Sequence, residues 1–150
     1  MKSTFVRNAF PSDMNRVLEL IQELATYEKA PNEVINTVEN LLRDCFGERK
    51  ICDCIVAEMD KEVVGFALFF TGYSTWKGRT LYLEDILVTD ACRGQGIGAL
   101  LIEKVVEIAK ERNVKRMDWQ VLEWNEPAIN FYKKYKAILD PEWLNGRLYF

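Results

Sequence analysis

The chain places a cluster of glycines directly between a strand-like run and a strongly amphipathic helix. The run TLYLEDILV ends at Val88, the segment TDACRGQGIG follows, and ALLIEKVVEIAKER then repeats apolar residues at helical spacing. Three of the eight glycines in the chain, Gly94, Gly96 and Gly98, lie in this segment. A glycine-rich loop that leads from a strand into a helix brings backbone N–H groups and the helix dipole close to an anion. This unit therefore predicts a loop that holds a phosphate.

Hydrophobic periodicity and turn residues predict the other elements. Strands are expected at residues 4–10, 51–59, 62–73, 80–88, 115–122, 137–139 and 147–150, and helices at 13–29, 38–46, 99–112 and 125–135. Asp60-Lys61 predicts a tight hairpin turn, and the helix after the glycine loop lets the strands on either side of it run parallel. The order β-α-α-β-β-β-α-β-α-β-β predicts an α/β protein with a mixed sheet. At 150 residues we expect one domain, spanning 1–150.

Composition excludes several classes of function. The chain has no histidine, which excludes Cys/His zinc sites and both Ser-His-Asp and Cys-His catalysis. Its four cysteines, Cys45, Cys52, Cys54 and Cys92, lack a framework spacing and suit core thiols in a reducing cytoplasm. The longest apolar run, 63–70, falls far short of the ~20 residues that cross a bilayer, and no signal peptide is evident. A net charge of -3 argues against wrapping nucleic acid. We therefore expect a cytoplasmic location, with neither nucleic acid nor a membrane as a partner.

Three interpretations of the glycine loop compete before any resemblance is considered. A Walker-type loop needs Gly-Lys-Ser/Thr at the start of the helix, where this chain has Gly98-Ala99-Leu100. A Rossmann fingerprint needs Gly-x-Gly-x-x-Gly and an acid about twenty residues later. Asp118 lies at that distance but inside the next predicted strand, and too little chain follows for a six-stranded dinucleotide fold. The third is a glycine turn that merely ends a strand.

A fourth interpretation includes Arg93. Arg93-x-x-Gly96-x-Gly98 resembles the Arg/Gln-x-x-Gly-x-Gly/Ala signature of the GCN5-related N-acetyltransferase (GNAT) superfamily, and the predicted element order is that of the superfamily. Four segments, ELATYEK, LYLEDILV, RGQGIG and EWNEPAINFY, together are similar to the diamine acetyltransferases. This family includes the spermidine/spermine N1-acetyltransferases and the thialysine acetyltransferases. The similarity covers nearly the whole chain.

The resemblance implies the GNAT fold, acetyl-CoA as co-substrate without a metal, a small cationic amine as acceptor, and a homodimer. It assigns three sets of residues to the cofactor. The pantetheine is expected at the backbone of Ile86, Leu87 and Val88, the pyrophosphate at Arg93, Gly94, Gln95, Gly96, Ile97, Gly98 and Ala99, and a further contact at Asn125 and Pro127. Asn125 is also the predicted N-cap of the last helix, with Pro127 in its first turn.

Glu84 and Asp85 interrupt a run that otherwise suits a central strand. A buried carboxylate is unfavourable unless it is paired, hydrogen-bonded or protonated. Side-chain alternation predicts that the two point to opposite faces of the sheet. Acetyl transfer requires an alkylammonium with a pKa of roughly 10.4 to lose its proton, and without histidine the carboxylates are the candidates for accepting it. The resemblance implies that Glu84 attracts the amine and takes its proton, directly or through water, whereas Asp85 fits a buried ion pair equally well.

Tyr132 is the second catalytic candidate. It shares a helical face with Asn125 and Ile129, as an ordinary core aromatic also would. The resemblance implies that Tyr132 protonates the departing CoA thiolate, and Tyr135 lies elsewhere on the helix. It also places the acceptor among the residues Tyr27, Glu28, Glu84, Asp85 and Glu142. Trp76 and Trp119 are candidates to line the alkyl chain of the acceptor, because tryptophan faces attract cations, and they suit core positions equally well. For Glu28 and Glu142 a solvated surface charge is the alternative.

Two features depart from the family pattern. The family often has glycine where this chain has Lys136, and the chain ends at Phe150, where relatives often continue.

The functional hypothesis is an acetyl-CoA-dependent amine N-acetyltransferase, an acyltransferase acting on a polyamine, a diamine or a thialysine-like amino acid. The alternatives are an acyl-CoA-binding sensor without catalysis, and a protein or peptide N-acetyltransferase.

Overall fold

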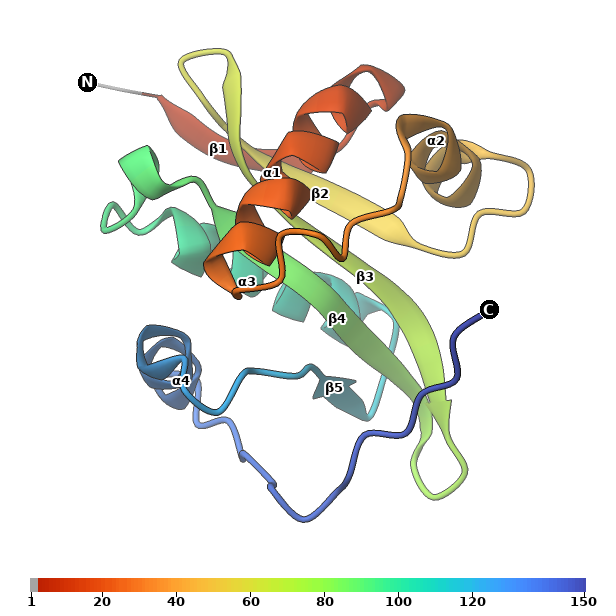
Figure 1. Cartoon of the computed structure of the whole chain (residues 1–150). Helices are drawn as coiled ribbons and strands as arrows, with labels where there is room; N and C mark the ends of the chain where they lie inside the picture. Colours follow the sequence, from red (N-terminus) through yellow and green to blue (C-terminus); the bar gives the residue numbers. More distant parts are fainter. Residues whose placement is uncertain (1–2) are drawn as a thin grey trace. The chain divides into compact units, whose positions relative to one another are not determined.

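The computed structural model describes residues 3–150, and the chain divides into two compact units, Met1–Trp119 and Gln120–Phe150. The first unit contains a five-stranded sheet in the order β1-β2-β3-β4-β5 (Figure 1). Its strands are β1 (Thr4–Asn8), β2 (Asp53–Met59), β3 (Glu62–Ser74), β4 (Gly78–Val88) and β5 (Arg116–Asp118). The helices are α1 (Met14–Tyr27), α2 (Val38–Phe46) and α3 (Ile97–Glu111) in the first unit and α4 (Glu126–Lys133) in the second; short 3-10 turns lie at Pro11–Asp13 and Asp90–Cys92.

Strand pairing follows the predicted hairpins and crossover. Strands β1 to β4 pair antiparallel with their neighbours, and β4 pairs parallel with β5. Asp60 and Lys61 have φ values of 51° and 69°, as a two-residue hairpin turn requires. The α/β class, the mixed sheet and the parallel pair across α3 are therefore confirmed.

Helices cover both faces of the sheet, with α1 and α2 on one face and α3 on the other (Figure 1). On α1 the residues Met14, Val17 and Leu20 recur at a spacing of three and are fully buried. They pack in one cluster with residues of α2 and the sheet, among them Phe66 and Leu87. This apolar layer fixes α1 against the strand that leads into the glycine loop.

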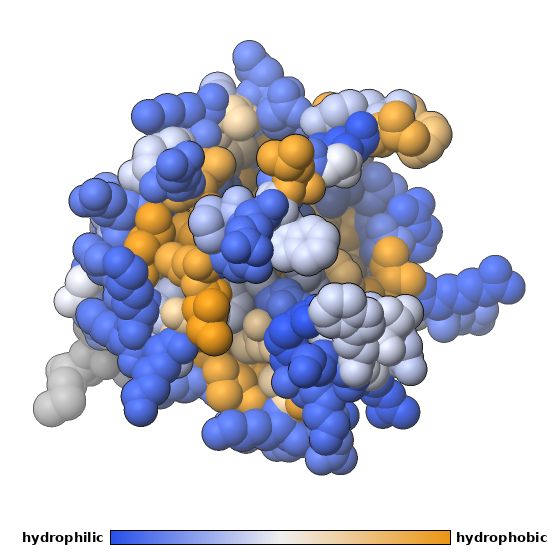
Figure 2. Space-filling view, turned by 90° about the horizontal axis from the view of Figure 1, so that it is seen from below, coloured by the Kyte–Doolittle hydropathy of each residue, from blue (hydrophilic) through white to orange (hydrophobic). Residues whose placement is uncertain are grey.

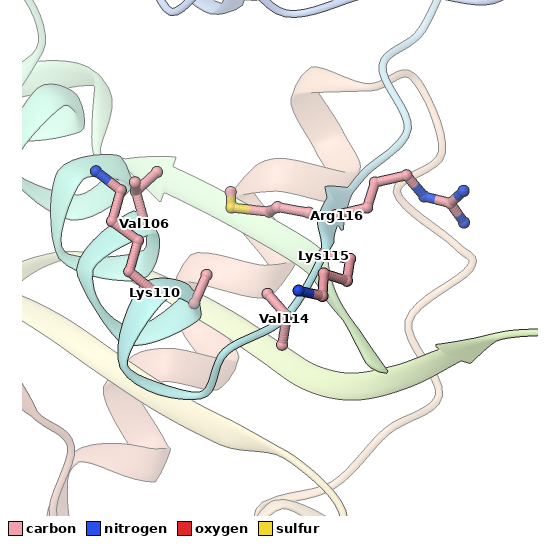
Figure 3. A pocket seen from close by; sticks show the side chains of 7 residues that line it. Val106, Lys110, Val114, Lys115 and Arg116 are labelled. Carbon is pink, nitrogen blue, oxygen red and sulfur yellow. The ribbon is translucent and has the colours of Figure 1, made fainter. Parts of the chain in front are cut away.

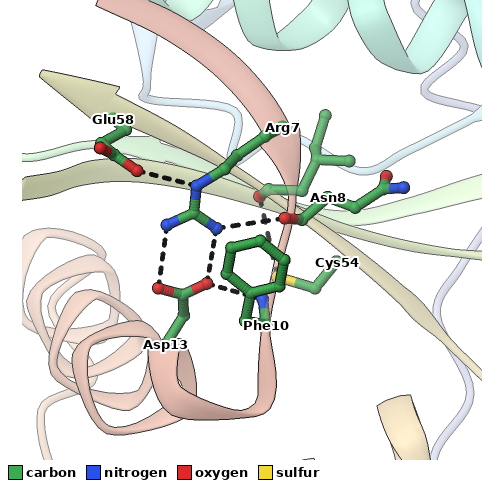
Figure 4. A network of polar contacts seen from close by, with 7 residues as sticks. Arg7, Asn8, Phe10, Asp13, Cys54 and Glu58 are labelled. Carbon is green, nitrogen blue, oxygen red and sulfur yellow. Dashed lines mark hydrogen bonds and ion pairs between the residues drawn. The ribbon is translucent and has the colours of Figure 1, made fainter. Parts of the chain in front are cut away.

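A polar network fixes the start of α1 against the sheet edge (Figure 4). Arg7 on β1 donates from both terminal nitrogens to Asp13, at 2.7 and 3.2 Å, and from Nε to Glu58 on β2 at 2.8 Å. The Asp13 carboxylate also accepts from the backbone N–H of Phe10 at 2.7 Å. A bidentate arginine–carboxylate pair has a defined geometry, so the network sets the direction in which α1 leaves β1.

The last part of the chain departs from the sequence prediction. Strand β5 covers three residues rather than 115–122, and after α4 the described chain forms no further helix or strand. The two short strands predicted at 137–139 and 147–150 are therefore wrong as regular elements. A strand requires a neighbouring backbone to satisfy its N–H and C=O groups. Ile138 and Leu148 are 92% and 85% exposed, so this segment also buries little apolar surface.

Apolar side chains interrupt the mainly hydrophilic surface in the view from below (Figure 2). None of the helices in the described part of the chain has the length and apolar character that spanning a bilayer requires. Among the described residues, no group of three or more cysteines and carboxylates is arranged to hold a metal ion.

Candidate active site

The glycine loop has a backbone that only glycine adopts easily. Gly94 and Gly96 have φ values of 75° and 79°, and Gly96 is the N-cap of the 15-residue helix α3. A Cβ added at either glycine would meet no heavy atom within 4 Å. The first turn of α3 has no acidic residue and its N-cap supplies no side-chain acceptor, so its N–H groups face the space in front of the loop. This concave backbone with open space before it fits a diphosphate.

Arg93 connects this loop to α1. Its Nε donates to the carbonyl oxygen of Val88 at 2.9 Å, and its Nη1 lies 3.4 Å from a carboxylate oxygen of Asp90. Its guanidinium carbon lies 5.0 Å from the centre of the Tyr27 ring, within the range of a cation–π contact. A predicted cofactor residue and a predicted acceptor residue are therefore in contact.

Glu23 makes a second connection, which the sequence analysis missed. Its carboxylate accepts from the Thr89 hydroxyl at 2.9 and 3.2 Å and from the backbone N–H of Asp90 at 2.9 Å. Glu23 lies one helical turn before Tyr27, so both side chains project toward the loop from one face of α1. That spacing within ELATYEK was the available signal, although it resembles that of any exposed glutamate.

Beyond Tyr82, one edge of β4 pairs with no strand of the described chain. Pairing with β5 stops at Tyr82, which lies opposite Asp118. The N–H of Thr89 donates to Val64 on β3 at 2.8 Å. Because antiparallel bonding alternates, the backbone groups of Ile86 and Val88 point away from β3. Of the three residues predicted for the pantetheine, these two face the open edge, and the side chain of Leu87 is buried in the core.

Strand β4 contains a β-bulge at Glu84, one of the two predicted catalytic residues. Asp85 lies opposite Leu68 and Leu83 lies opposite Phe69, so Glu84 is an extra residue in β4. The simple alternation that predicted opposite faces for Glu84 and Asp85 therefore does not apply. Glu84 is exposed and Asp85 is half-buried. The bulge takes Glu84 out of the regular ladder, while Asp85 keeps its position opposite Leu68.

The electrostatics of this site are acidic. Burial, together with the charges of Glu84 and Glu28, raises the pKa of Asp85 to about 7. Burial also raises the pKa of Glu28, which caps the C-terminus of α1. Within residues 3–150, none of the three carboxylates forms an ion pair. The buried ion pair considered for Asp85 is therefore absent, and the cluster suits a cationic ligand.

The two tryptophans considered for the acceptor site differ in position. Trp76 is 87% exposed in the β3–β4 turn, at the opposite end of β4 from Val88. That position argues against a wall shared with Asp85. Trp119 directly follows β5 and is half-buried.

The second unit carries the remaining predicted residues. Asn125 is the N-cap of α4, and its side-chain oxygen accepts from the N–H of Ala128 at 3.4 Å, with Pro127 in the first turn. Tyr132 is buried, at 6% exposure, whereas Tyr135 on the same helix is 37% exposed. Glu142 is exposed. Lys136 follows α4 with a φ of 60°, the left-handed conformation that glycine adopts without strain.

A shallow hollow elsewhere has the wrong charge for an amine (Figure 3). It measures about 150 Å³ and lies between the end of α3 and the segment entering β5. Val106 and Val114 contribute apolar surface, but Lys110, Lys115 and Arg116 surround it with cations. Like charges repel, so this hollow does not suit a cationic acceptor.

Comparison with known proteins yields a consistent set of similarities. The model of the Acetyltransferase (GNAT) family matches residues 15–136. A thialysine N-epsilon-acetyltransferase from Bos taurus is 42% identical over 145 residues, which cover 91% of this chain and 85% of that protein. A human spermidine/spermine N(1)-acetyltransferase-like protein 1 is 36% identical over 89% of this chain and 20% of its own length. The solved structure of an integron cassette protein from the mobile metagenome of V. cholerae superposes with a TM-score of 0.79 at 25% identity, covering 99% of this chain and 93% of that one.

Proposed function

The chain belongs to the acetyltransferase (GNAT) family and is an acetyl-CoA-dependent N-acetyltransferase; on this premise we propose that its acceptor is a primary amine of a small polycation. The acceptor class is a diamine, a polyamine or a thialysine-like amino acid. Relatives named for thialysine and for spermidine/spermine support this class. These compounds share a flexible chain with a terminal ammonium group.

One observation carries the proposal: three carboxylates gather at the bulge without a cation among the described residues. Burial, together with the charges of Glu84 and Glu28, raises the pKa of Asp85, so each additional negative charge there is unfavourable. An ammonium group would relieve that repulsion and gain charge-assisted hydrogen bonds. The aromatic ring of Tyr27, at the end of α1, offers the adjacent alkyl chain an apolar surface.

The resemblance to the diamine acetyltransferases supplies the proposed chemistry. Acetyl-CoA supplies an acetyl thioester. The open backbone of Ile86 and Val88 would hold the pantetheine, and the amides of residues 94–99 with Arg93 would hold the diphosphate. Glu84 would accept the proton of the amine, directly or through water, so that a neutral nitrogen attacks. Tyr132 would give its phenolic proton to the CoA thiolate, and Asn125 and Pro127 would contact the cofactor.

Incubation of the protein with acetyl-CoA and a panel of amines, followed by mass spectrometry, tests the acceptor class. The panel contains spermidine, a short diamine, thialysine, lysine, an aminoglycoside and a lysine-containing peptide. We expect acetylated product from the diamine, polyamine or thialysine. Product from the peptide alone would indicate a protein acetyltransferase, and CoA binding without any product would indicate a sensor.

Two variants test the assigned roles. Glu84→Gln and Tyr132→Phe should each lower kcat about 100-fold or more while CoA still binds, because each removes a proton-transfer group. Tyr135→Phe is the matched control for the phenol and should leave kcat within about twofold, since this ring is part-exposed on the same helix. Undiminished turnover in both variants would remove this mechanism.

Assembly and location belong to the same proposal. We propose a homodimer in the cytoplasm. The exposed apolar side chains of residues 138–150, among them Leu144 and Leu148 at 97% and 85%, support self-association. Light scattering after size-exclusion chromatography tests it, and a monomer at micromolar concentration would contradict it.

A further inference from the structure

Two cysteines outside the candidate active site lie in van der Waals contact. The Sγ atoms of Cys45 and Cys52 are 3.3 Å apart. Cys45 is in the last turn of α2, and Cys52 immediately precedes β2. No described residue separates the two sulfur atoms, and both are free thiols.

The backbone already holds the two segments side by side. The carbonyl oxygen of Asp44, next to Cys45, accepts from the N–H of Ile51 at 2.8 Å and from the N–H of Cys52 at 3.2 Å. The Cys52 thiol also lies 3.5 Å from the same oxygen. A disulfide needs the backbones of its two cysteines to lie close together, and the Asp44 contacts hold the end of α2 beside the start of β2.

A cavity gives small molecules access to this pair. It measures about 430 Å³ and its lining includes Cys45, Cys54, Lys50 and Asp53. Cys52 itself is half-buried. The cavity therefore borders Cys45, the first of the two thiols that a small reagent entering it would meet.

We infer that Cys45 and Cys52 form a reversible disulfide by exchange with a small-molecule disulfide. The thiolate of one cysteine attacks the reagent, forms a mixed disulfide and releases one small thiol. The second cysteine then attacks the mixed disulfide, forms the Cys45–Cys52 bond and releases the second small thiol. Two protein thiols are oxidised, the reagent is reduced to two thiols, and the two protons from the cysteines end on them.

The surroundings make this exchange slow at neutral pH. Burial and the contact with Cys52 raise the pKa of Cys45 to about 12, and the carboxylates of Asp44 and Asp53 act in the same direction. Burial also raises the pKa of Cys52, with the hydrogen bond to Cys45 opposing it. Because the thiolate is the nucleophile, the rate should rise with pH over the alkaline range.

Neither of the other two cysteines takes part in the 3.3 Å sulfur contact that joins Cys45 and Cys52. Cys54 is buried and donates its S–H to the carbonyl oxygen of Ile55 at 3.7 Å. Cys92 is buried in the turn Asp90–Cys92, between the end of β4 and the glycine loop. The geometry therefore favours one pairing among the six that four cysteines allow.

Closure of the loop 45–52 restricts the unfolded chain and should raise Tm by about 5 °C or more. The bond leaves the glycine loop and the carboxylates of β4 unchanged. Formation of the Cys45–Cys52 disulfide is therefore independent of the acceptor class proposed above.

The test incubates the reduced protein at pH 8.5 with increasing ratios of oxidised to reduced glutathione. Intact mass under non-reducing conditions should decrease by two hydrogen atoms, and the free thiol count should fall from four to two. Peptide mapping should link Cys45 to Cys52. Cys45→Ser and Cys52→Ser should each abolish the change in mass and the rise in Tm, whereas Cys92→Ser should retain both.

Three results would overturn the inference. Four free thiols at the highest ratio would show that the pair does not react. A stable glutathione adduct without closure would show that the second step fails. A bond that maps to Cys54 in place of Cys45 or Cys52 would show that the wrong pair closes.

Discussion

Asp53 on β2 and Asp85 on β4 lie on opposite faces of one sheet, and the two carboxylates have opposite surroundings. Leu68 on β3 lies opposite Cys54 on β2 and opposite Asp85 on β4, so the three residues form one row across the strands. Asp85 therefore shares a face with Cys54, and Asp53, one residue earlier, points to the other face, toward α3. Both aspartates are half-buried, so loss of water disfavours the charge of each.

Their partners decide the sign of the net effect. Burial raises the pKa of Asp53, but hydrogen bonds from Lys50 at 2.7 Å and Arg112 at 2.8 Å outweigh it and leave the pKa below its ordinary value. At Asp85 burial acts together with two carboxylate charges, and the pKa rises to about 7. A charge that is satisfied within the protein stabilises the fold, and a charge that is left unsatisfied is available for a ligand.

The largest expected effect is a separation of activity between two amide variants. Asp85→Asn should lower kcat/KM for the best amine about 10- to 100-fold, because a charge-assisted hydrogen bond to a cation contributes roughly 1.5–3 kcal/mol. Asp53→Asn should leave kcat/KM within about twofold. Steady-state kinetics on both variants measures the difference. Equal losses in both would show that the contrast between the two faces has no functional meaning.

The pH dependence of stability should have opposite signs at the two aspartates. The folded-state pKa of Asp85, about 7, lies above the value near 3.9 of an unfolded aspartate, so the folded state holds the proton longer. The contribution of Asp85 to the free energy of unfolding therefore falls as pH rises from about 4 to 7. The decrease is about 2 kcal/mol after allowance for residual exposure. Asp53 stabilises the fold above about pH 4 and loses that contribution below it.

Urea unfolding at pH 4, 5.5 and 8 measures this difference. Asp85→Asn should gain stability relative to the original protein mainly at pH 8. Asp53→Asn should lose stability at pH 8 and approach the original protein as the pH falls below 4. If the free energy of unfolding changed with pH in the same way in both variants, the opposite pKa shifts assigned to Asp85 and Asp53 would be wrong.

Glu23 extends the functional face from the carboxylates to the glycine loop. Glu23→Ala should weaken CoA binding about tenfold, because it removes a carboxylate that accepts from both Thr89 and Asp90. Glu19→Ala on the same helix is the control, since Glu19 pairs with Arg16 on the same helix and its side chain is 66% exposed.

A double-mutant cycle with Thr89→Val separates positioning from general destabilisation. Calorimetry should show that the loss of CoA affinity from Glu23→Ala shrinks when Thr89 is already valine. A lower Tm with unchanged CoA affinity would make Glu23 a purely structural residue.

Local patterns made part of this structure predictable. The helix Val38–Phe46 was predicted with its observed bounds, because Thr37 accepts from the N–H of Asn40 at its start and Gly47 follows its end. The glycine loop lies between β4 and α3 as expected, since strand period, glycine cluster and helix period coincide there.

Features that depend on distant partners were less predictable. The bulge at Glu84 could not be predicted from the apolar run that contains it, because a bulge is defined by the register with the neighbouring strand β3. Glu23 resembled a solvated charge until Thr89 was placed opposite it. The strands expected at 137–139 and 147–150 had suitable residues, but strand pairing is a property of two segments, and the sequence of one does not supply its neighbour.

The smallest expected effect concerns two arginines, each in contact with an aromatic ring. The guanidinium of Arg112 lies 5.4 Å from the centre of the Phe69 ring and donates to Asp53, whereas that of Arg93 lies 5.0 Å from the Tyr27 ring beside the glycine loop. Arg112→Gln should lower the free energy of unfolding by about 0.5–1 kcal/mol and leave the KM for acetyl-CoA unchanged, because a part-exposed ion pair contributes little more.

Arg93→Gln should do the reverse. It should raise the KM for acetyl-CoA about threefold, because glutamine lacks the positive charge that attracts a diphosphate. The free energy of unfolding should change little, because glutamine keeps a donor for the carbonyl oxygen of Val88. Chemical denaturation and acetyl-CoA titrations on both variants measure the two quantities. The contrast proposed here has charges paired within the protein on the Asp53 face and charges available to a ligand on the Asp85 face. A change of KM in Arg112→Gln, or a change of stability alone in Arg93→Gln, would contradict it.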